Sequence, residues 1–199
     1  MHPYTVEDGE RRRVHIILGF LSVFLTLALA RVTKALAFEM PWWVDSPSVV
    51  GFYGLTYALF DRVLWRWRPL RGHGLSSMPV LEGTWSATIT SSFDGHQNVH
   101  RGVTRIRQTW THILISLETG SSTSRSIAAC ASFSADQYPL VWYLFQNTPR
   151  AGATITMEAH VGAATMRVKD DALLEEEYFS GRGRTNYGTI VLTREHPPQ

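Results

Sequence analysis

The side chains in this sequence that could do chemistry are arginines and aromatic residues set close together. Arg182 and Arg184 stand in a Gly-Arg-Gly-Arg stretch, where small neighbours allow a ligand to approach the backbone closely. Guanidinium groups bind phosphates and carboxylates, and aromatic faces stack on other rings. The candidate binding residues are Arg105, Arg107, Trp110, Tyr143, Arg182, Arg184 and Tyr187.

Each of these residues also has a simpler interpretation. An arginine on a strand is usually an outward, solvated residue, and a Gly-Arg-Gly-Arg stretch is usually only a turn. The aromatics Trp142, Tyr143 and Phe145 fit a packed core as well as a binding platform. Residues 175–177 are three glutamates, which form a solvated face, a patch that repels an anionic ligand, or a contact between subunits.

Catalytic patterns are not found in the sequence. His96, His100 and His112 lack the cysteine or carboxylate neighbours of a metal site, and Cys130 lies in an apolar strand as a small core residue. No Gly-x-Ser-x-Gly, P-loop or paired-carboxylate motif is present. The sequence therefore predicts a non-enzymatic protein with no cofactor and no metal.

The first third of the chain contains the apolar segments. Residues 14–30 carry no charge and as a helix would extend about 26 Å, close to the roughly 30 Å hydrocarbon core of a bilayer. Arg31 and Lys34 can snorkel to the headgroups, so a helix over about 14–38 would span with tilt. A soluble core helix would need a larger protein, and a signal peptide has a shorter apolar core.

A second apolar segment, residues 48–67, is interrupted by Asp61 and Arg62. We place both at the membrane interface; the alternative is that Asp61 faces the other helix as a functional carboxylate. Residues 39–47 are predicted to be a loop with its tryptophan pair at the headgroups. The expected domain is therefore a transmembrane hairpin over residues 1–71, with spans at about 14–38 and 48–67 and a frayed polar segment at 1–13.

Charge separates the two parts of the chain. Residues 1–71 contain nine Lys and Arg against six Asp and Glu, whereas residues 72–199 contain ten against eleven. The basic residues flank the apolar segments, which predicts a multi-pass protein with both termini in the cytoplasm. A surface for DNA or RNA polymers is disfavoured. The single cysteine allows no intrachain disulfide, in keeping with a reducing compartment.

Beyond a Gly-, Ser- and Pro-containing linker at residues 68–79, the hydrophobic period changes to two. Short strands without intervening helices favour a sandwich or a barrel, and barrel closure removes the exposed edge strands. We predict an all-β domain over residues 80–195, an eight-stranded antiparallel up-and-down β-barrel. The expected strands are 85–90, 98–110, 112–118, 125–134, 140–147, 154–168, 172–179 and 187–194.

Gly83, Thr84 and Trp85 open the first of these strands, and Arg194 ends the last. This pair resembles the lipocalin-like arrangement, in which a Gly-x-Trp on the first strand is covered by an arginine from the last. We expect Trp85 to seal one barrel end and the Arg194 guanidinium to stack on it. Both would then be poor candidates for ligand binding.

Two apolar spans followed at once by an eight-stranded barrel resemble the two-transmembrane β-barrel effectors of bacterial CBASS anti-phage systems, the CD-NTase-associated membrane effectors. The most similar local stretches are residues 178–194 (YFSGRGRTNYGTIVLTR) and 81–85 (LEGTW). The resemblance implies that the barrel binds a cyclic dinucleotide made by a partner CD-NTase. It also implies that ligand-driven self-association gathers the helices, which disrupt the bacterial inner membrane and kill the cell.

The candidate residues suit such a ligand, whose two phosphates call for guanidinium groups and whose two bases call for aromatic faces. Two alternatives stay open: a membrane-tethered, lipocalin-like binder of an apolar ligand, and a non-catalytic membrane scaffold. The lining of the barrel interior separates the three. Inward arginines favour the nucleotide, an apolar cavity favours the carrier, and a filled core favours the scaffold.

Overall fold

The computed structural model describes residues 1–6, 9–36, 42–72, 74–133, 138–151, 153, 158–181 and 185–195, without the side chains of residues 42–47 and 72. The chain forms two compact units. One is a helical unit, Asp8–Ser77, and the other joins Met1–Glu7 to Met78–Gln199. The N-terminal segment thus belongs to the same unit as the strand-rich part of the chain, although the helical unit separates them in sequence.

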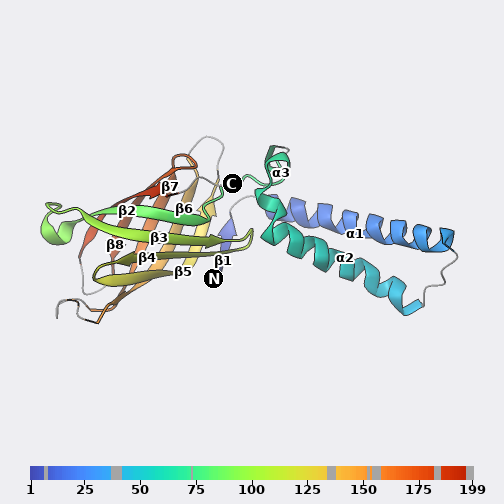
Figure 1. Ribbon diagram of the computed structural model, residues 1–199, viewed down its shortest axis with the longest axis horizontal. Helices are drawn as coiled ribbons and strands as arrows, with labels where there is room; N and C mark the ends of the chain where they lie inside the picture. The colour runs from blue at the N-terminus through green and yellow to red at the C-terminus, as the bar shows by residue number, and fades with distance from the viewer. Residues whose placement is uncertain are drawn as a thin grey trace. The chain divides into compact units, whose positions relative to one another are not determined.

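The strand-rich unit is a closed barrel of nine described strands in the order β1-β4-β3-β2-β9-β8-β7-β6-β5 (Figure 1). Strands β2 to β9 follow one another as antiparallel neighbours, and β9 returns to pair with β2. The up-and-down arrangement is therefore confirmed for these strands. Their bounds, in chain order, are β1 His2–Val6, β2 Gly83–Ser91, β3 His100–Gln108, β4 His112–Thr119, β5 Ser122–Ser132, β6 Leu140–Pro149, β7 His160–Val168, β8 Leu173–Ser180 and β9 Tyr187–Arg194.

The predictions of eight strands and of a frayed N-terminus are wrong, because β1 completes the wall between β4 and β5. The β4–β5 pairing covers only three residues of β4, from Ser116 to Glu118. Beyond that point the two strands diverge, and β1 pairs antiparallel with β4 and parallel with β5. In β1 the buried Tyr4 alternates with the exposed Thr5, so its inner face contributes to the core.

Several predicted strand limits shift in the structure. The strand predicted over 98–110 is β3, which ends at Gln108, so Trp110 follows it in the turn before β4. The strand predicted over 154–168 corresponds to β7, which begins at His160. A 3-10 turn, η2 (Ser92–Asp94), occupies the predicted loop between β2 and β3. Residues 134 and 154–157 of the predicted strands lie outside the described residues.

The helical unit contains α1 (Glu10–Ala35), α2 (Trp42–Arg62), η1 (Leu64–Arg66) and α3 (Arg68–Gly72). Within the described part of the chain, only α1 is long and apolar enough by itself to cross a membrane. Helix α2 begins at Trp42, so residues 42–47 of the predicted loop at 39–47 are helical, and residues 39–41 lie outside the described residues. The predicted linker likewise contains α3.

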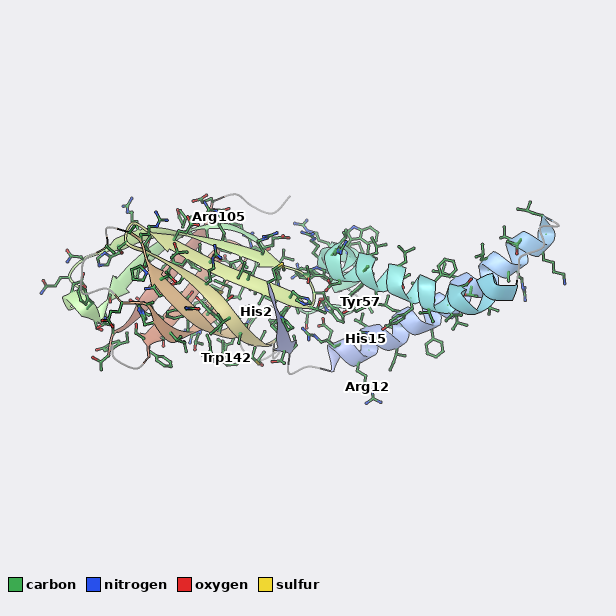
Figure 2. All side chains as sticks on the ribbon, turned by 90° about the horizontal axis from the view of Figure 1, so that it is seen from below. His2, Arg12, His15, Tyr57, Arg105 and Trp142 are labelled. Carbon is green, nitrogen blue, oxygen red and sulfur yellow. The ribbon has the colours of Figure 1, made fainter. Side chains whose placement is uncertain are left out.

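Helix α1 buries a narrow stripe against α2 and leaves its other faces apolar and exposed. Val14, Leu18 and Ser22 are buried at a spacing of four residues, whereas Phe20 is 74% and Phe24 66% exposed. On the shared side, His15 Nδ1 lies 2.8 Å from Tyr53 Oη, and the His15 ring stacks on Tyr57 at 5.6 Å (Figure 2). Apolar side chains exposed in this number are the mark of a surface that contacts lipid or protein rather than water.

One half of the barrel interior is filled by side chains. Trp85 is completely buried, its Nε1 donates to the Leu81 carbonyl at 3.0 Å, and the Arg194 guanidinium lies 4.1 Å from the ring centroid. The predicted Trp–Arg closure is therefore confirmed. Further layers of this half come from large buried residues on other strands, namely Ile106, Ile113, Val141, Met166, Leu174 and Leu192.

Candidate ligand-binding site

The other half of the barrel interior is a cavity of about 780 Å³. This volume lies within the range of about 300–1,000 Å³ found for small-molecule sites. Its wall is largely apolar, with residues such as Ile89, Leu117 and Phe145, and it carries polar groups from β5 and β6. Among these, Ser124 Oγ donates to Asn147 Oδ1 at 3.1 Å. Of the three linings that separate the candidate functions, the filled core of a scaffold is therefore not observed in this half of the barrel.

The floor of the cavity, where it meets the packed half, carries a carboxyl group. Glu176 follows the fully buried Leu174 along β8 and pairs in register with the fully buried Met166 of β7. Its own side chain is only 4% exposed and lines the cavity. Tyr143 Oη, from β6, donates to Glu176 Oε1 at 2.6 Å. A hydrogen-bonded acid therefore sits at the deepest polar point of the lumen.

Burial dominates the electrostatics of this pair. It raises the pKa of Glu176 to about 7, and the hydrogen bond from Tyr143 offsets part of that rise. The pKa of Tyr143 is raised too, first by burial and then by the nearby carboxylate. Among the residues that the structure describes, no ion pair compensates Glu176. The carboxyl of Glu176 therefore gains or loses its proton in the neutral pH range.

This arrangement gives a pH dependence of stability with a definite sign. The pKa of Glu176 is about 7 in the folded protein, against 4.5 for an ordinary glutamate. Between these two pH values the unfolded chain has lost this proton while the folded chain still holds it. Stability should therefore fall as pH rises from about 5 to 7 and level off above, a loss of about 3 kcal/mol. Thermal unfolding of the wild type and of Glu176→Gln across pH 5.5–8.5 tests this; the glutamine variant should lose the slope. Equal slopes in the two proteins would contradict it.

Two glycines make room for the aromatic rings of the cavity wall. A Cβ on Gly162 would lie 2.3 Å from the Phe145 ring, which packs directly over it from the neighbouring strand. A Cβ on Gly188 would lie 2.8 Å from the Tyr178 ring and 2.1 Å from the Thr90 carbonyl oxygen. With glycine at both positions, the rings of Phe145 and Tyr178 can lie against the wall, which keeps the lumen open.

Gly188→Ala should therefore destabilise the barrel by about 1–3 kcal/mol, since a backbone carbonyl cannot move aside as a side chain would. The matched control is Gly120→Ala, at a cavity-lining glycine where an added Cβ meets nothing within 4 Å. Urea unfolding of the two variants makes the comparison. Equal stabilities would mean that the close contact at Gly188 relaxes at no cost.

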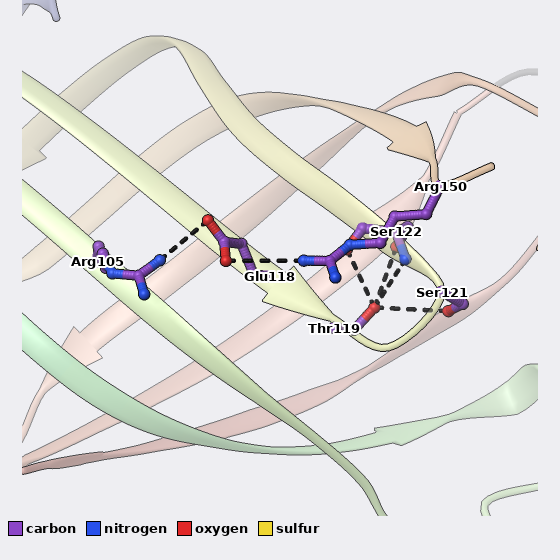
Figure 3. Close-up of polar contacts among 6 residues, drawn as sticks. All are labelled: Arg105, Glu118, Thr119, Ser121, Ser122 and Arg150. Carbon is purple, nitrogen blue, oxygen red and sulfur yellow. Dashed lines mark hydrogen bonds and ion pairs between the residues drawn. The ribbon is translucent and has the colours of Figure 1, made fainter.

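The structure does not bring the candidate residues of β3 and β9 into the cavity. Thr104, Ile106 and Gln108 face inward, so Arg105 and Arg107, which alternate with them, are exposed on the outer wall. Figure 3 shows Arg105 Nη1 paired with Glu118 Oε1 at 2.9 Å, on the same carboxylate that Arg150 approaches at 3.7 Å. Figure 2 likewise shows Arg105 at the outer surface. Such exposed pairs contribute little to stability.

The remaining candidates divide among three locations. Tyr143 lines the cavity floor, whereas Trp110 is fully buried and is not among the cavity-lining residues. Tyr187 is 60% exposed on the outside of β9, beside the His96 ring at 5.7 Å. Arg182 and Arg184 lie outside the described residues. Tyr143 is thus the one described candidate that the structure places in the lumen.

Sequence reasoning missed the carboxyl at the floor because it treated residues 175–177 as one group, whether a solvated face, a repelling patch or a subunit contact. Strand alternation separates them: Glu176 faces inward, while Glu175 and Glu177 face out. Glu175 pairs outside with Lys169 at 3.2 Å. The sequence did contain a signal for this residue. Leu174 and Tyr178 lie two positions before and after Glu176, so all three share the face of the strand that points inward.

The fold and the cavity define a class: a β-barrel with a ligand-sized lumen, joined to an apolar helical unit. Residues 76–194 match the family model described as Cap15, cyclic dinucleotide receptor domain, and residues 12–66 match Cap15, TM helices. CD-NTase-associated protein 15 of Yersinia aleksiciae is 35% identical over 208 residues, covering 98% of each chain. The chain belongs to the Cap15 family. The resemblance to CD-NTase-associated CBASS effectors is thereby confirmed.

Proposed function

We propose that this protein is a CBASS effector whose barrel binds a cyclic dinucleotide inside the lumen. The observation that carries the proposal is the cavity of about 780 Å³ within the segment that matches a cyclic dinucleotide receptor domain. Aromatic rings of Phe145 and Tyr178 offer stacking surfaces for bases. A partner CD-NTase makes the ligand, and binding promotes self-association of the protein in the inner membrane.

A thermal-shift screen of the detergent-solubilised full chain tests the ligand. Cyclic dinucleotides at saturating concentration should raise the melting temperature, because a ligand that binds only the folded state stabilises it by mass action. Linear dinucleotides of the same bases serve as the control for non-specific binding. A folded barrel that no cyclic dinucleotide stabilises would refute the proposal.

A second candidate function is supported by the apolar part of the same wall. Ile89, Phe93 and Leu117 line the cavity, and within the described residues Arg101 is the one arginine among the lining side chains. An apolar small molecule would fit such a surface. The same screen should therefore include fatty acids and isoprenoid alcohols, and stabilisation by these alone would favour the carrier function.

The placement of β1 supports two membrane crossings. Strand β1 precedes α1, and β2 follows α3, yet both are strands of one barrel. Within the helical unit, Glu10 at the start of α1 accepts hydrogen bonds from Ser77 N at 2.7 Å and Ser77 Oγ at 2.5 Å. If α1 crosses a bilayer, the chain must return to its starting side, and α2 is the described helix long enough to bring it back. Both termini would then lie on the same side of the bilayer, and the basic residues that flank the apolar segments favour the cytoplasmic side.

The effector role predicts that the helical unit is needed for toxicity and not for binding. Replacing residues 8–77 with a flexible linker keeps β1 in the barrel, so the variant should fold in solution and bind the ligand. It should no longer disrupt membranes or arrest growth when the partner CD-NTase is active. Dye release from vesicles and colony counts measure the two effects, and toxicity of the linker variant would show that the helices are not the killing element.

A further inference from the structure

Glu176 is an unusual group for the floor of a cavity that takes a dianionic ligand. An ionised carboxylate repels phosphates, so the deepest part of the lumen disfavours the charged portion of a cyclic dinucleotide. The opposite end differs, because His100, Arg101 and His160 are among its lining residues, at the starts of β3 and β7. His100 Nε2 lies 3.0 Å from Asp94 Oδ2, which offsets a charge on that ring, so Arg101 supplies the cation at this mouth. This distribution favours an orientation of the ligand with its phosphates at the mouth and one base at the floor.

The floor presents hydrogen-bond acceptors to that base. Tyr143 Oη donates to Glu176 Oε1 and holds the carboxyl in place, while a carboxylate has about four lone-pair sites for further donors. The register neighbours of Glu176 on β7 and β9 are the apolar Met166 and Ile190. The other titratable side chain near it is Tyr178, two residues along β8 and in the cavity wall.

Guanine is the base whose edge matches such an acceptor. Its N1–H and N2–H₂ groups are adjacent donors, which a carboxylate accepts as a bidentate pair. Adenine, cytosine and uracil each place an acceptor beside the donor on the same edge, which would face the carboxylate unfavourably. A buried polar site rejects a ligand that leaves its groups unpaired.

Resting on the proposed function, we propose that Glu176, positioned by Tyr143, reads the Watson–Crick edge of a guanine, and that the activating ligand is a guanine-containing cyclic dinucleotide. The raised pKa of Glu176, to about 7, makes this recognition pH-dependent, because the carboxyl accepts both guanine donors only after it has lost its proton. Burying Glu176 with no described cation beside it costs stability. Guanine binding is a function that would explain why an acid is placed there.

Isothermal titration of the full chain in detergent with cyclic di-GMP, cyclic GMP–AMP, cyclic di-AMP and cyclic di-UMP tests the proposal. Both guanine ligands should bind at least tenfold more tightly than the other two. Glu176→Gln should weaken guanine ligands tenfold or more and narrow the gap to cyclic di-AMP, since an amide both donates and accepts. Glu177→Gln, the outward neighbour on the same strand, should leave all affinities unchanged.

A pH series separates recognition from a purely structural effect. Guanine-ligand affinity of the wild type should fall below about pH 7, and the Glu176→Gln variant should lack that fall. The difference between the two proteins isolates Glu176, because every other side chain of the cavity is the same in both. Tighter binding of cyclic di-AMP or cyclic di-UMP overturns the guanine assignment and leaves the proposed function standing, whereas no binding by any cyclic dinucleotide overturns both.

Discussion

Deleting residues 2–6 from the full chain should lower the melting temperature of the barrel by about 10–20 °C, a loss of roughly 3–5 kcal/mol. Strand β1 supplies the buried Tyr4, whose hydroxyl contacts Met78 Sδ, and its removal opens the wall where β4 and β5 diverge. His2 Nε2 also lies 2.8 Å from Ser126 Oγ, which accepts from the Ile115 N–H at 2.9 Å. Tryptophan fluorescence during heating measures the change.

Two substitutions test whether the inward-facing side chain of β1, rather than the backbone pairing of the strand alone, provides the stability. Tyr4→Ala should account for most of the loss, because it removes a buried aromatic side chain and leaves a cavity. Thr5→Ala, on the exposed face, should change stability by less than about 0.5 kcal/mol. Comparable effects of the two substitutions would show that β1 does not pack as an inner strand. The deletion should also promote aggregation, since it leaves two unpaired strand edges.

Trp85→Ala should destabilise the barrel by about 3–5 kcal/mol. The indole is fully buried, and it supports the Arg194 guanidinium at 4.1 Å from its ring centroid. Arg194 in turn donates to the carbonyls of Val80, Glu82 and Asp171 at 2.7, 2.7 and 2.6 Å, which joins three segments of the chain. Losing the ring therefore loosens the contacts of the closed end as well as its packing. Urea unfolding gives the magnitude.

Trp85→Phe is the matched control, since it keeps an aromatic face under Arg194 and loses only part of the volume and the bond to the Leu81 carbonyl. It should cost clearly less than the alanine substitution and should leave ligand affinity unchanged, because Trp85 does not line the cavity. A loss of affinity in this folded variant would mean that the packed half and the lumen are coupled.

The sequence was sufficient where the signal is local. Alternation with a period of two identified β4 and β9 almost to the residue, because side-chain direction in a strand depends only on its neighbours. The apolar run near the N-terminus identified α1 by length and composition. The Trp85–Arg194 pair was read from a short motif whose geometry the closed barrel confirms.

Only the tertiary structure decided what depends on distant pairing. Tyr4 meets Ala129 across a parallel register, and a polar five-residue strand carries no local sign of that partner. Arg105 and Glu176 show the same limit at the site. The sequence around each one predicts a strand with alternating faces, but only closure of the barrel determines which of the two faces points into the lumen. Local chemistry thus specified the strands and the helix, and long-range packing selected the residues that meet inside.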